Sequence, residues 1–278
     1  MDRHRLLVDC PDEPGLIYRI TAVLFQHGCS IVRNQEFVDP ESAHFFMRSE
    51  FTGGSELSTV ITELEGVLPG SARIRLAAAE DRRLVVLVTK EHHCLGELLL
   101  LDSFGELGAS VLAVVGNHPN LEPLASRFDK PFHLISHVGI SRPEHEAQVT
   151  ETVARYEPDY VVLAKYMRVL TPIFLTRYGG RIINIHHSFL PAFVGAHPYR
   201  QAFERGVKLI GATAHFVTDV LDEGPIIAQS VIPVDHSYTP ARMAQAGRDV
   251  EKQVLARALK LVCEERVFLV GNRTVVFD

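Results

Sequence analysis

The chain has 278 residues, of which 46% are hydrophobic, and its 19 glycines and 15 prolines are spread along its length. This composition is typical of a globular protein of one or two domains. The formal net charge of -6, from 34 acidic and 28 basic residues, gives a phosphate backbone no overall attraction, so we expect no nucleic-acid partner.

The cysteines and the apolar segments limit the cellular setting. Cys10, Cys29, Cys94 and Cys263 lie far apart without C-x-x-C spacing, which favours reduced thiols over disulfides or a zinc site. The first apolar run is too short for a signal peptide, and no segment approaches the roughly 18 consecutive apolar residues of a spanning helix. We therefore expect a cytoplasmic protein with no membrane partner.

The first 80 residues predict a small domain of alternating strands and helices. Turn residues in PDEPG separate a strand over 4–10 from a helix in which Leu16, Ile20 and Val23 recur at helical spacing. Further strands are predicted over 29–38, 43–51 and 72–79, with a second helix from Leu57, capped by Ser55, between the last two. The order is βαββαβ, a sheet with helices on one face.

The pattern changes after the segment EDRR at 80–83, which we take as the boundary between a domain over 1–80 and one over 84–278. The later strands are apolar throughout, over 84–88, 110–115 and 160–164, and helical stretches separate them. Strands buried on both faces are typical of a mostly parallel sheet in a doubly wound α/β domain. A long helix after 236–240 and a hairpin over 267–277 are predicted to complete the chain.

The segment NIHHS at 184–188 ends a predicted strand over 181–185. Ligands of open parallel sheets bind beyond the carboxyl ends of the strands, so chemistry is expected here. Adjacent side chains on a strand point to opposite faces, which leaves a structural role open for one or both histidines. Neither this pair nor His92-His93-Cys94 has neighbours at metal-ligand spacing, so we expect no metal.

A second segment, 211–229, supplies the acids that such a site needs. It contains a strand, a loop with Asp219, Asp222 and Glu223, and a Gly-Pro turn into another strand. Together the two segments offer an amide to polarise a carbonyl, an imidazole for proton transfer, and a carboxylate to orient the imidazole or activate water. This set of groups favours attack on an acyl carbon.

These residues carry a resemblance to a known family. Asn-Ile-His followed by Ser-Phe-Leu-Pro-Ala-Phe, then Gly-Ala-Thr-Ala-His-Phe-Val and Leu-Asp-Glu-Gly-Pro-Ile-Ile, resemble the formyltransferase-fold family that uses 10-formyltetrahydrofolate, over residues 84–278. The resemblance implies that Asn184, His186 and Asp222 are catalytic. The segment LAKYMRVL at 163–170 is similar to the family's folate pocket. The substrate-binding residues implied in this way are Met167, Arg168, Val169, Leu170, His187, Val217, Thr218 and Asp219.

The family includes both transferases and hydrolytic members, the deformylases. The transferases typically have proline where this chain has His187, and the deformylases have histidine. Transferases that act on glycinamide ribonucleotide hold its phosphate in a loop with Gly, Ser and Asn after the first strand. The corresponding stretch here, 86–99, has no glycine before Gly96 and carries Glu91, which Lys90 offsets only in part. The basic carboxyl-terminal extension of methionyl-tRNA formyltransferases also has no counterpart here.

The resemblance therefore implies hydrolysis of 10-formyltetrahydrofolate to formate and tetrahydrofolate, which supplies formate and balances the one-carbon folate pool for purine biosynthesis. Formyl transfer to an amine such as glycinamide ribonucleotide is the alternative, and a binding regulator without activity is disfavoured because all three catalytic positions are present. In the expected mechanism Asp222 takes a proton from water, and Asn184 with His186 stabilises the oxyanion. No metal or other cofactor is expected, because the formyl carbon is already activated.

Residues 4–80 resemble an ACT domain, a ferredoxin-like fold, through the βαββαβ order and the segment DCPDEPGLIYRITAVLFQHGCSI. Such domains generally pair edge to edge and bind small amino acids at the shared interface. The resemblance implies a homo-oligomer, a dimer or tetramer, with an amino-acid effector. Asp12, Gly15 and Leu16 are the candidates for contacting that effector.

Overall fold

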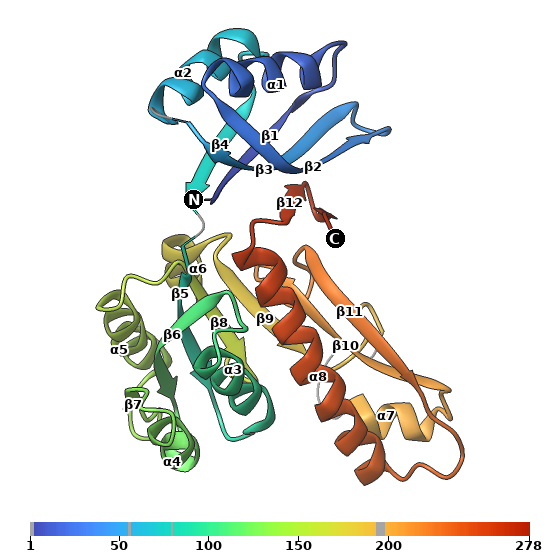
Figure 1. Ribbon diagram of the computed structural model, residues 1–278. Helices are drawn as coiled ribbons and strands as arrows, with labels where there is room; N and C mark the ends of the chain where they lie inside the picture. Colours follow the sequence, from blue (N-terminus) through green and yellow to red (C-terminus); the bar gives the residue numbers. More distant parts are fainter. Residues whose placement is uncertain (1–2, 55–56, 79, 193–197) are drawn as a thin grey trace. The chain divides into compact units, whose positions relative to one another are not determined.

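The computed structural model describes residues 3–54, 57–78, 80–192 and 198–278 (Figure 1). The predicted cap Ser55 and the motif residue Phe193 lie outside these ranges. The chain divides into two compact units. The first contains Met1–Glu80, Glu264–Phe268 and Val276–Asp278, and the second contains Asp81–Cys263 and Leu269–Val275.

The first unit is a four-stranded antiparallel sheet with two helices on one face (Figure 1). Its strand order is β2-β3-β1-β4, which places the first strand in the interior and β2 at an edge. The elements are β1 (Arg3–Pro11), α1 (Leu16–Gln26), β2 (Cys29–Asp39), β3 (His44–Gly53), α2 (Leu57–Val67) and β4 (Arg73–Ala78). The predicted order βαββαβ is confirmed.

Alternating side chains build the core of this unit. Leu6, Val8 and Cys10 lie on the face of β1 that meets the helices, and Leu16 and Ile20 of α1 pack against them. Gly15 precedes α1 with a φ of 88°, a left-handed conformation that glycine adopts at little cost. Burial of one face of α1 explains the predicted helical spacing, and the left-handed conformation of Gly15 explains the turn before the helix.

The C-terminal segment completes the first unit. The guanidinium of Arg48, only 1% exposed, donates to the carbonyl oxygens of Glu265 (2.9 Å) and Glu264 (2.7 Å) and to the carboxylate of Glu50 (2.7 Å). Phe268 packs edge-on against Phe46. The predicted terminal hairpin forms, as β12 (Val267–Val270) and β13 (Arg273–Val276), but its outer residues group with the first unit.

The second unit is built on a seven-stranded sheet in the order β11-β10-β9-β8-β5-β6-β7 (Figure 1). Five neighbouring strands are parallel, whereas β10 runs antiparallel to both β9 and β11, so the mostly parallel sheet expected from the apolar strands is confirmed. The strands are β5 (Arg82–Val88), β6 (Ala109–Gly116), β7 (Phe132–Leu134), β8 (Tyr160–Ala164), β9 (Ile182–His186), β10 (Leu209–Phe216) and β11 (Ile226–Pro233).

Helices cover both faces of this sheet, which is why its central strands are apolar throughout. Residues of α5 and α6 form one core cluster with β5 and β8, and α8 packs on β9, β10 and β11 beside α3 (Figure 1). The helices are α3 (His93–Ser103), the short helix η1 (Pro119–Leu121), α4 (Glu122–Ser126), α5 (Arg142–Ala154), α6 (Pro172–Tyr178), α7 (Pro198–Glu204) and α8 (Pro240–Cys263).

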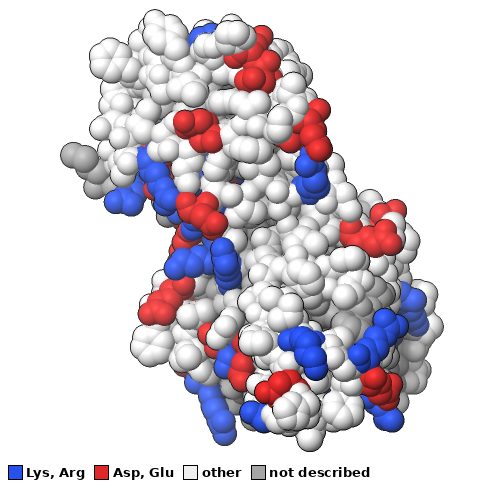
Figure 2. Space-filling view, turned by 90° about the vertical axis from the view of Figure 1, so that its right-hand side faces the viewer, with Lys and Arg blue, Asp and Glu red and all other residues white. Residues whose placement is uncertain are grey.

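The surface carries mixed charge. On the face shown in Figure 2, Lys and Arg side chains lie among Asp and Glu side chains and do not merge into a continuous basic area. Within the described ranges, every helix is too short or too polar to cross a membrane. Because positive and negative side chains alternate on this face, it does not present one sign of charge that would attract a highly charged ligand.

Replacement of Arg48 by Met is expected to lower the free energy of unfolding of the first unit by about 3–5 kcal/mol, because it leaves one buried carbonyl, one partly buried carbonyl and a partly buried carboxylate without their donor. Urea unfolding followed by circular dichroism measures the change. Arg155→Met is the control, since Arg155 pairs with Glu151 on the surface and the two side chains are 63% and 71% exposed, and its cost should stay below about 1 kcal/mol. Equal costs for the two variants would show that Arg48 does not hold the C-terminal segment.

Candidate active site

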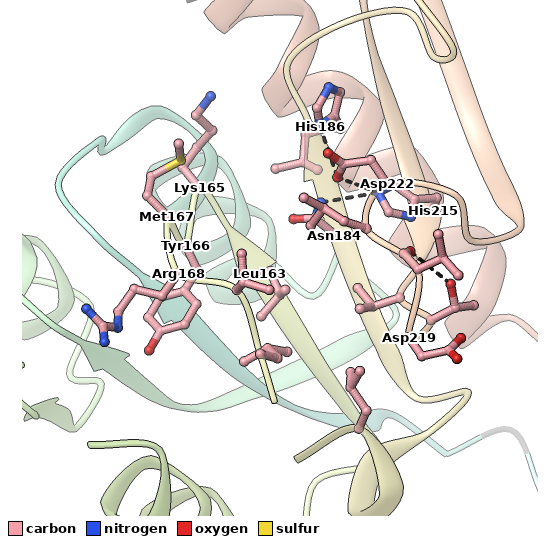
Figure 3. Close-up of a pocket in the computed structure, with 18 of the residues that line it drawn as sticks. Leu163, Lys165, Tyr166, Met167, Arg168, Asn184, His186, His215, Asp219 and Asp222 are labelled. Atoms are coloured by element: carbon pink, nitrogen blue, oxygen red, sulfur yellow. Dashed lines mark hydrogen bonds and ion pairs between the residues drawn. The ribbon is translucent and has the colours of Figure 1, made fainter. Parts of the chain in front are cut away.

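A pocket of about 290 Å³ opens at the carboxyl ends of β8 and β9 (Figure 3). All eleven residues that the sequence assigned to catalysis or substrate binding line it, so the structure brings together segments that are far apart in the chain. The same pocket is lined by eight further residues, namely Leu163, Lys165, Tyr166, Leu175, Ile185, His215, Val220 and Leu221.

Asn184 is held by its neighbour on the adjacent strand. The β9–β10 register places His215 opposite Asn184, and the amide Nδ2 lies 3.2 Å from His215 Nε2. His215 Nδ1 lies 2.8 Å from the carbonyl oxygen of Phe216, so Nδ1 carries the proton and Nε2 accepts from the amide. Burial lowers the pKa of His215, which keeps this imidazole neutral. One N–H of Asn184 is thereby used, and the second is left for a ligand.

His186 and Asp222 form a hydrogen-bonded pair. His186 Nδ1 lies 3.2 Å from Asp222 Oδ1, and the two side chains are only 7% and 13% exposed. The hydrogen bond from His186 holds the pKa of Asp222 below its ordinary value, against the opposing effect of burial. His186 Nε2 is buried and has no partner among the described residues. With Nδ1–H donating to the carboxylate, Nε2 is the nitrogen available for proton transfer.

The loop that carries Asp222 has a tightly constrained backbone. Asp222 has a φ of 58°, a left-handed conformation that is uncommon outside glycine. Two residues later, a Cβ on Gly224 would lie 1.8 Å from the carbonyl oxygen of Phe216, so only glycine fits there. The side-chain amide of Asn272 also donates to the carbonyl oxygen of Glu223. The position of the carboxylate therefore depends on close backbone packing around it.

The opposite wall of the pocket carries exposed apolar side chains beside Arg168. Met167 and Val169 are 61% and 55% exposed, although neither is charged or polar, while Leu170 is buried against the core. Thr89 Oγ1 accepts from the backbone N–H of Met167, and Arg142 donates to the carbonyl oxygen of Val169, so this segment has a defined conformation. Exposed apolar side chains on a fixed backbone provide a surface on which a flat aromatic ring can pack.

His187, the second histidine of the pair, lies between two pockets. It lines the main pocket and also a smaller, mostly apolar one with Tyr199 and Gly211. Its ring stacks on that of His186, with centroids 5.0 Å apart and planes at 13°. Its burial lowers the pKa of His187 to about 4, and the charges of Lys165 and His186 act in the same direction. The imidazole is therefore neutral at physiological pH.

The buried polar groups behind the pocket were not predicted from the sequence. Lys165 stands inside the segment LAKYMRVL but was given no role, and His215 stands inside GATAHFV. Glu251 lies among the apolar residues that α8 turns toward the sheet, and it is 1% exposed. One acid at a core position of an amphipathic helix is the signal that could have identified Glu251.

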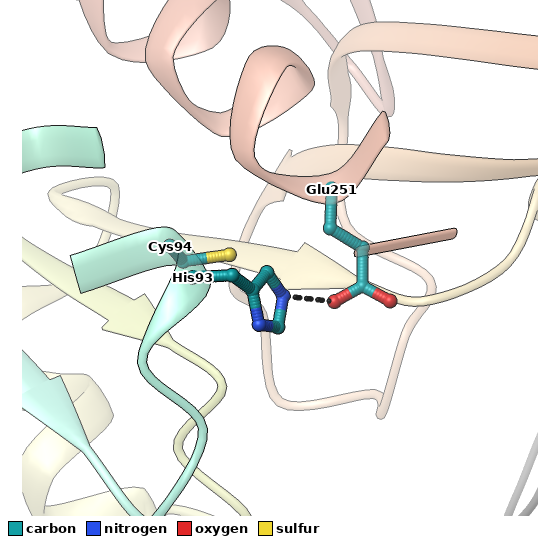
Figure 4. A group of neighbouring side chains, drawn as sticks. All are labelled: His93, Cys94 and Glu251. Atoms are coloured by element: carbon teal, nitrogen blue, oxygen red, sulfur yellow. Dashed lines mark hydrogen bonds and ion pairs between the residues drawn. The ribbon is translucent and has the colours of Figure 1, made fainter. Parts of the chain in front are cut away.

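One group of side chains has the composition of a metal site. His93, Cys94 and Glu251 place ligand atoms within 4.8 Å of one another (Figure 4). The carboxylate of Glu251 is already occupied, because it accepts from Tyr199 and His93 and pairs with Lys165. Burial raises the pKa of Cys94 well above its ordinary value, which disfavours the thiolate that a metal requires. The fixed ammonium of Lys165 further opposes a cation here.

The three candidates for effector binding lie around the start of α1. Asp12 and Gly15 are exposed, and the backbone N–H of Asp12 donates to the carbonyl oxygen of Ala43. Leu16 is 2% exposed and packs in the core of the first unit. Its side chain is therefore committed to the core, whereas Asp12 and Gly15 are accessible to a ligand.

Two sequence families match the chain, the Formyl transferase family over residues 82–259 and the ACT domain over residues 4–69. The chain is 55% identical over 276 residues to the formyltetrahydrofolate deformylase of Escherichia coli, covering 99% of each protein. A crystal structure of a formyltetrahydrofolate deformylase from Pseudomonas syringae is 39% identical with a TM-score of 0.95, covering 100% of this chain and 95% of that one.

A crystal structure of glycinamide ribonucleotide transformylase 1 from Symbiobacterium toebii is 34% identical with a TM-score of 0.68. The match between the two covers 95% of the transformylase but only 71% of this chain. The similarity to the transformylase thus extends over part of the chain, whereas the similarity to the deformylases extends over its full length.

Replacement of Gly224 by Ala is expected to lower catalytic turnover about tenfold or more, because the added Cβ displaces the loop that positions Asp222. Steady-state kinetics with purified protein measures the loss. Gly66→Ala is the control, since Gly66 lies in α2 and a Cβ added there would meet no atom within 4 Å. If Gly224→Ala had unchanged turnover, the position of this loop would not matter for activity.

Proposed function

This chain belongs to the formyltetrahydrofolate deformylases, which are hydrolases, and we propose that Asn184, His186 and Asp222 carry out its reaction. The reaction is the hydrolysis of 10-formyltetrahydrofolate. A water oxygen bonds to the formyl carbon, the bond from that carbon to N10 breaks, and formate and tetrahydrofolate are released. The observation that supports the assignment is the His186–Asp222 pair beside Asn184 at the base of one pocket.

The hydrogen bonds in the site support a division of roles that differs from the sequence-based expectation. Asp222 is a weak base, because the hydrogen bond from His186 lowers the pKa of the carboxyl group. Asp222 instead fixes the tautomer of His186 and stabilises the imidazolium that forms. His186 Nε2, which is buried and has no partner among the described residues, removes a proton from the attacking water. We therefore propose that Asp222 acts through His186 rather than as the direct proton acceptor expected from the sequence.

Asn184 stabilises the charge that develops on the formyl oxygen. His215 holds one amide N–H of Asn184, which leaves the other N–H directed by a fixed side chain rather than a rotating one. A fixed donor stabilises an oxyanion without reorganising in the transition state. The proton gained by His186 then passes to N10 as the tetrahedral intermediate collapses, and the formic acid released loses its acidic proton to solvent to give formate. The pair of His186 and Asp222 thereby returns to its starting state.

The pocket residues also support the proposed position of the folate. The exposed apolar side chains of Met167 and Val169 offer a surface for the pterin ring, and Arg168 lines the same wall. On the other side, Val217, Thr218 and Asp219 lie on the segment that leads from β10 to Asp222. A ring held on these two segments places N10 near the base of the pocket. These chain residues supply the proton transfer and the oxyanion donor, so we propose a reaction without a cofactor.

The first unit supports proposals on assembly and regulation. Its edge strand β2 exposes apolar side chains, with Val32 at 52%, Phe37 at 42% and Val38 at 40% exposed. An edge of this kind favours pairing with a second copy, so we propose a homo-oligomer, a dimer or tetramer. The match to the ACT domain supports an amino-acid effector near Asp12 and Gly15. We also propose that the protein acts in the cytoplasm, where folates are used.

Replacement of Asp222 by Asn is expected to reduce formate release by a factor on the order of 10² or more, because the amide cannot stabilise the imidazolium of His186. Folate binding should change by less than about threefold, since the shape is preserved. Formate production and folate titration measure the two effects. Glu223→Gln is the control, as an acid in the same loop. Turnover near that of the unaltered protein would remove Asp222 from the mechanism.

Addition of glycinamide ribonucleotide is expected to leave the rate of formate release unchanged and to yield no formylated amine. The full-length match to deformylases supports this result, and the transferase alternative is the less supported one. Chromatographic separation of the products with and without the amine is the measurement. Formylated glycinamide ribonucleotide as the main product would establish the transferase instead.

A further inference from the structure

The tip of the C-terminal hairpin binds the loop that carries Asp222. The hairpin consists of β12 and β13, and its tip is the Gly-Asn turn between them. The side-chain amide of Asn272 donates a 2.8 Å hydrogen bond to the carbonyl oxygen of Glu223, the residue after Asp222. Thr274 Oγ1 donates a 2.6 Å hydrogen bond to the carbonyl oxygen of Ile226, the first residue of β11. These two hydrogen bonds hold the backbone that follows the catalytic carboxylate.

The base of the same hairpin belongs to the first unit. Glu264–Phe268 and Val276–Asp278 group with that unit, whereas the tip, Leu269–Val275, groups with the second. The buried guanidinium of Arg48 on β3 binds the two carbonyls that lie just before the hairpin, and Gln35 on β2 donates a 2.8 Å hydrogen bond to the carbonyl oxygen of the last residue. One short hairpin is therefore held at its base by strands of the first unit and at its tip by the loop of the active site.

The hairpin can pass a displacement from its base to its tip, because its two strands are bonded to each other. β12 and β13 form a two-stranded sheet. At the base, the backbone N–H of Phe277 donates to the carbonyl oxygen of Arg266 (2.9 Å), and Arg266 Nε donates back to the carbonyl oxygen of Phe277 (2.5 Å). The ring of Phe268 packs edge-on against both Phe277 and Phe46 of β3. Packed and hydrogen-bonded elements of this kind carry coupling between distant sites.

The loop at the tip has little room to absorb a displacement. Gly224 packs so closely on the carbonyl oxygen of Phe216 that a Cβ there would lie 1.8 Å from this oxygen. A shift of the Glu223 carbonyl is therefore passed to Asp222, the residue bonded to it. The carboxylate of Asp222 lies 3.2 Å from His186 Nδ1, near the limit of a hydrogen bond. Misplacement of a catalytic group by about 1 Å can cost on the order of a hundredfold in rate.

We propose that the C-terminal hairpin is the link through which the first unit sets the position of Asp222, with Asn272 and Thr274 as positioning residues. The inference rests on the proposed function of Asp222. Arg48 fixes the base of the hairpin, the tip fixes the loop, and the loop holds Asp222 against His186. Asn272 and Thr274 lie outside the pocket and act through Asp222. A ligand or a second copy that moves β2 or β3 thereby changes kcat without occupying the folate pocket.

The first measurement releases the tip of the hairpin in the full chain. Asn272→Ala removes the donor and should lower kcat about three- to tenfold. The KM for 10-formyltetrahydrofolate should stay within about twofold, because the walls that bind the substrate are unchanged. Asn272→Asp keeps the size of the side chain but cannot donate to a carbonyl, so its kcat should fall at least as far. Leu269→Ala, on the same hairpin, is the control and should keep its kcat, since Leu269 is 40% exposed.

A double-mutant cycle tests whether Asn272 acts through Asp222. In the background of Asp222→Asn the position of the loop no longer matters, so Asn272→Ala should cause no further fall in the residual rate. A general structural defect would instead lower the residual rate by the same factor as in the unaltered chain.

A second cycle tests the link to the first unit. Arg48→Lys keeps the charge but lacks the planar fork that binds both carbonyls, and it should lower kcat about two- to threefold. In the background of Asn272→Ala the same change should have no effect, because the tip is already released. Arg19→Lys is the matched control, since Arg19 binds the carbonyl oxygen of Val67 within the first unit, and it should leave kcat unchanged.

A further variant keeps the second cycle decisive if Arg48→Lys does not fold. Phe268→Leu loosens the packing of the hairpin base on Phe46 while leaving the buried charges in place, and it should show the same fall in kcat and the same dependence on Asn272.

The inference is overturned if folded Asn272→Ala has full turnover, if its loss persists in Asp222→Asn, or if changes at the base leave kcat unaltered. Losses at the base and at the tip that multiply would overturn it as well, since the two ends would then act independently. Each of these results leaves the proposed function standing, because the proposed function fails on a different measurement, full turnover of Asp222→Asn.

Discussion

The antiparallel pairing of β10 with β9 is the constraint on which the site depends. This pairing places His215 opposite Asn184 and Thr213 opposite His186, and it leads the chain directly into the loop that holds Asp222. Because successive side chains on a strand alternate between faces, Asn184 and His186 share one face, and the register sets which residues of β10 lie opposite them. A slip by one residue would turn both away from the pocket. The backbone hydrogen bonds of one strand pair therefore align the amide, the imidazole and the carboxylate together.

Three histidines at this strand pair show how local environment separates chemical roles. His186 donates to a carboxylate, His215 donates to a backbone carbonyl and accepts from an amide, and His187 is half-buried in the pocket that Lys165 also lines. The side chains are identical, but their neighbours fix a different proton arrangement for each one. The adjacent histidines of the segment NIHHS are therefore not duplicates, because His186 is paired with Asp222 whereas His187 stacks on the His186 ring.

Much of this arrangement follows from the sequence, because periodicity and motif spacing are local properties. The apolar strand 160–164, the turn at Gly15 and the helix after 236–240 are encoded by residues close to one another. Contacts between distant residues are not encoded in this way. The pairing of Lys165 with Glu251 joins the end of β8 to α8, and neither side chain alone signals a partner. The binding of Glu264 and Glu265 to Arg48 is likewise invisible in a hairpin pattern.

The interaction of Arg48 with the C-terminal segment has a consequence for synthesis of the chain. A ribosome releases the N-terminus first, so residues up to Glu80 are free to form their sheet long before Glu264–Phe268 exist. During that interval the guanidinium of Arg48 lacks the two carbonyls that it binds in the finished protein. The first unit to emerge is consequently the last to be completed, and it reaches its final packing only after the whole second unit has been translated.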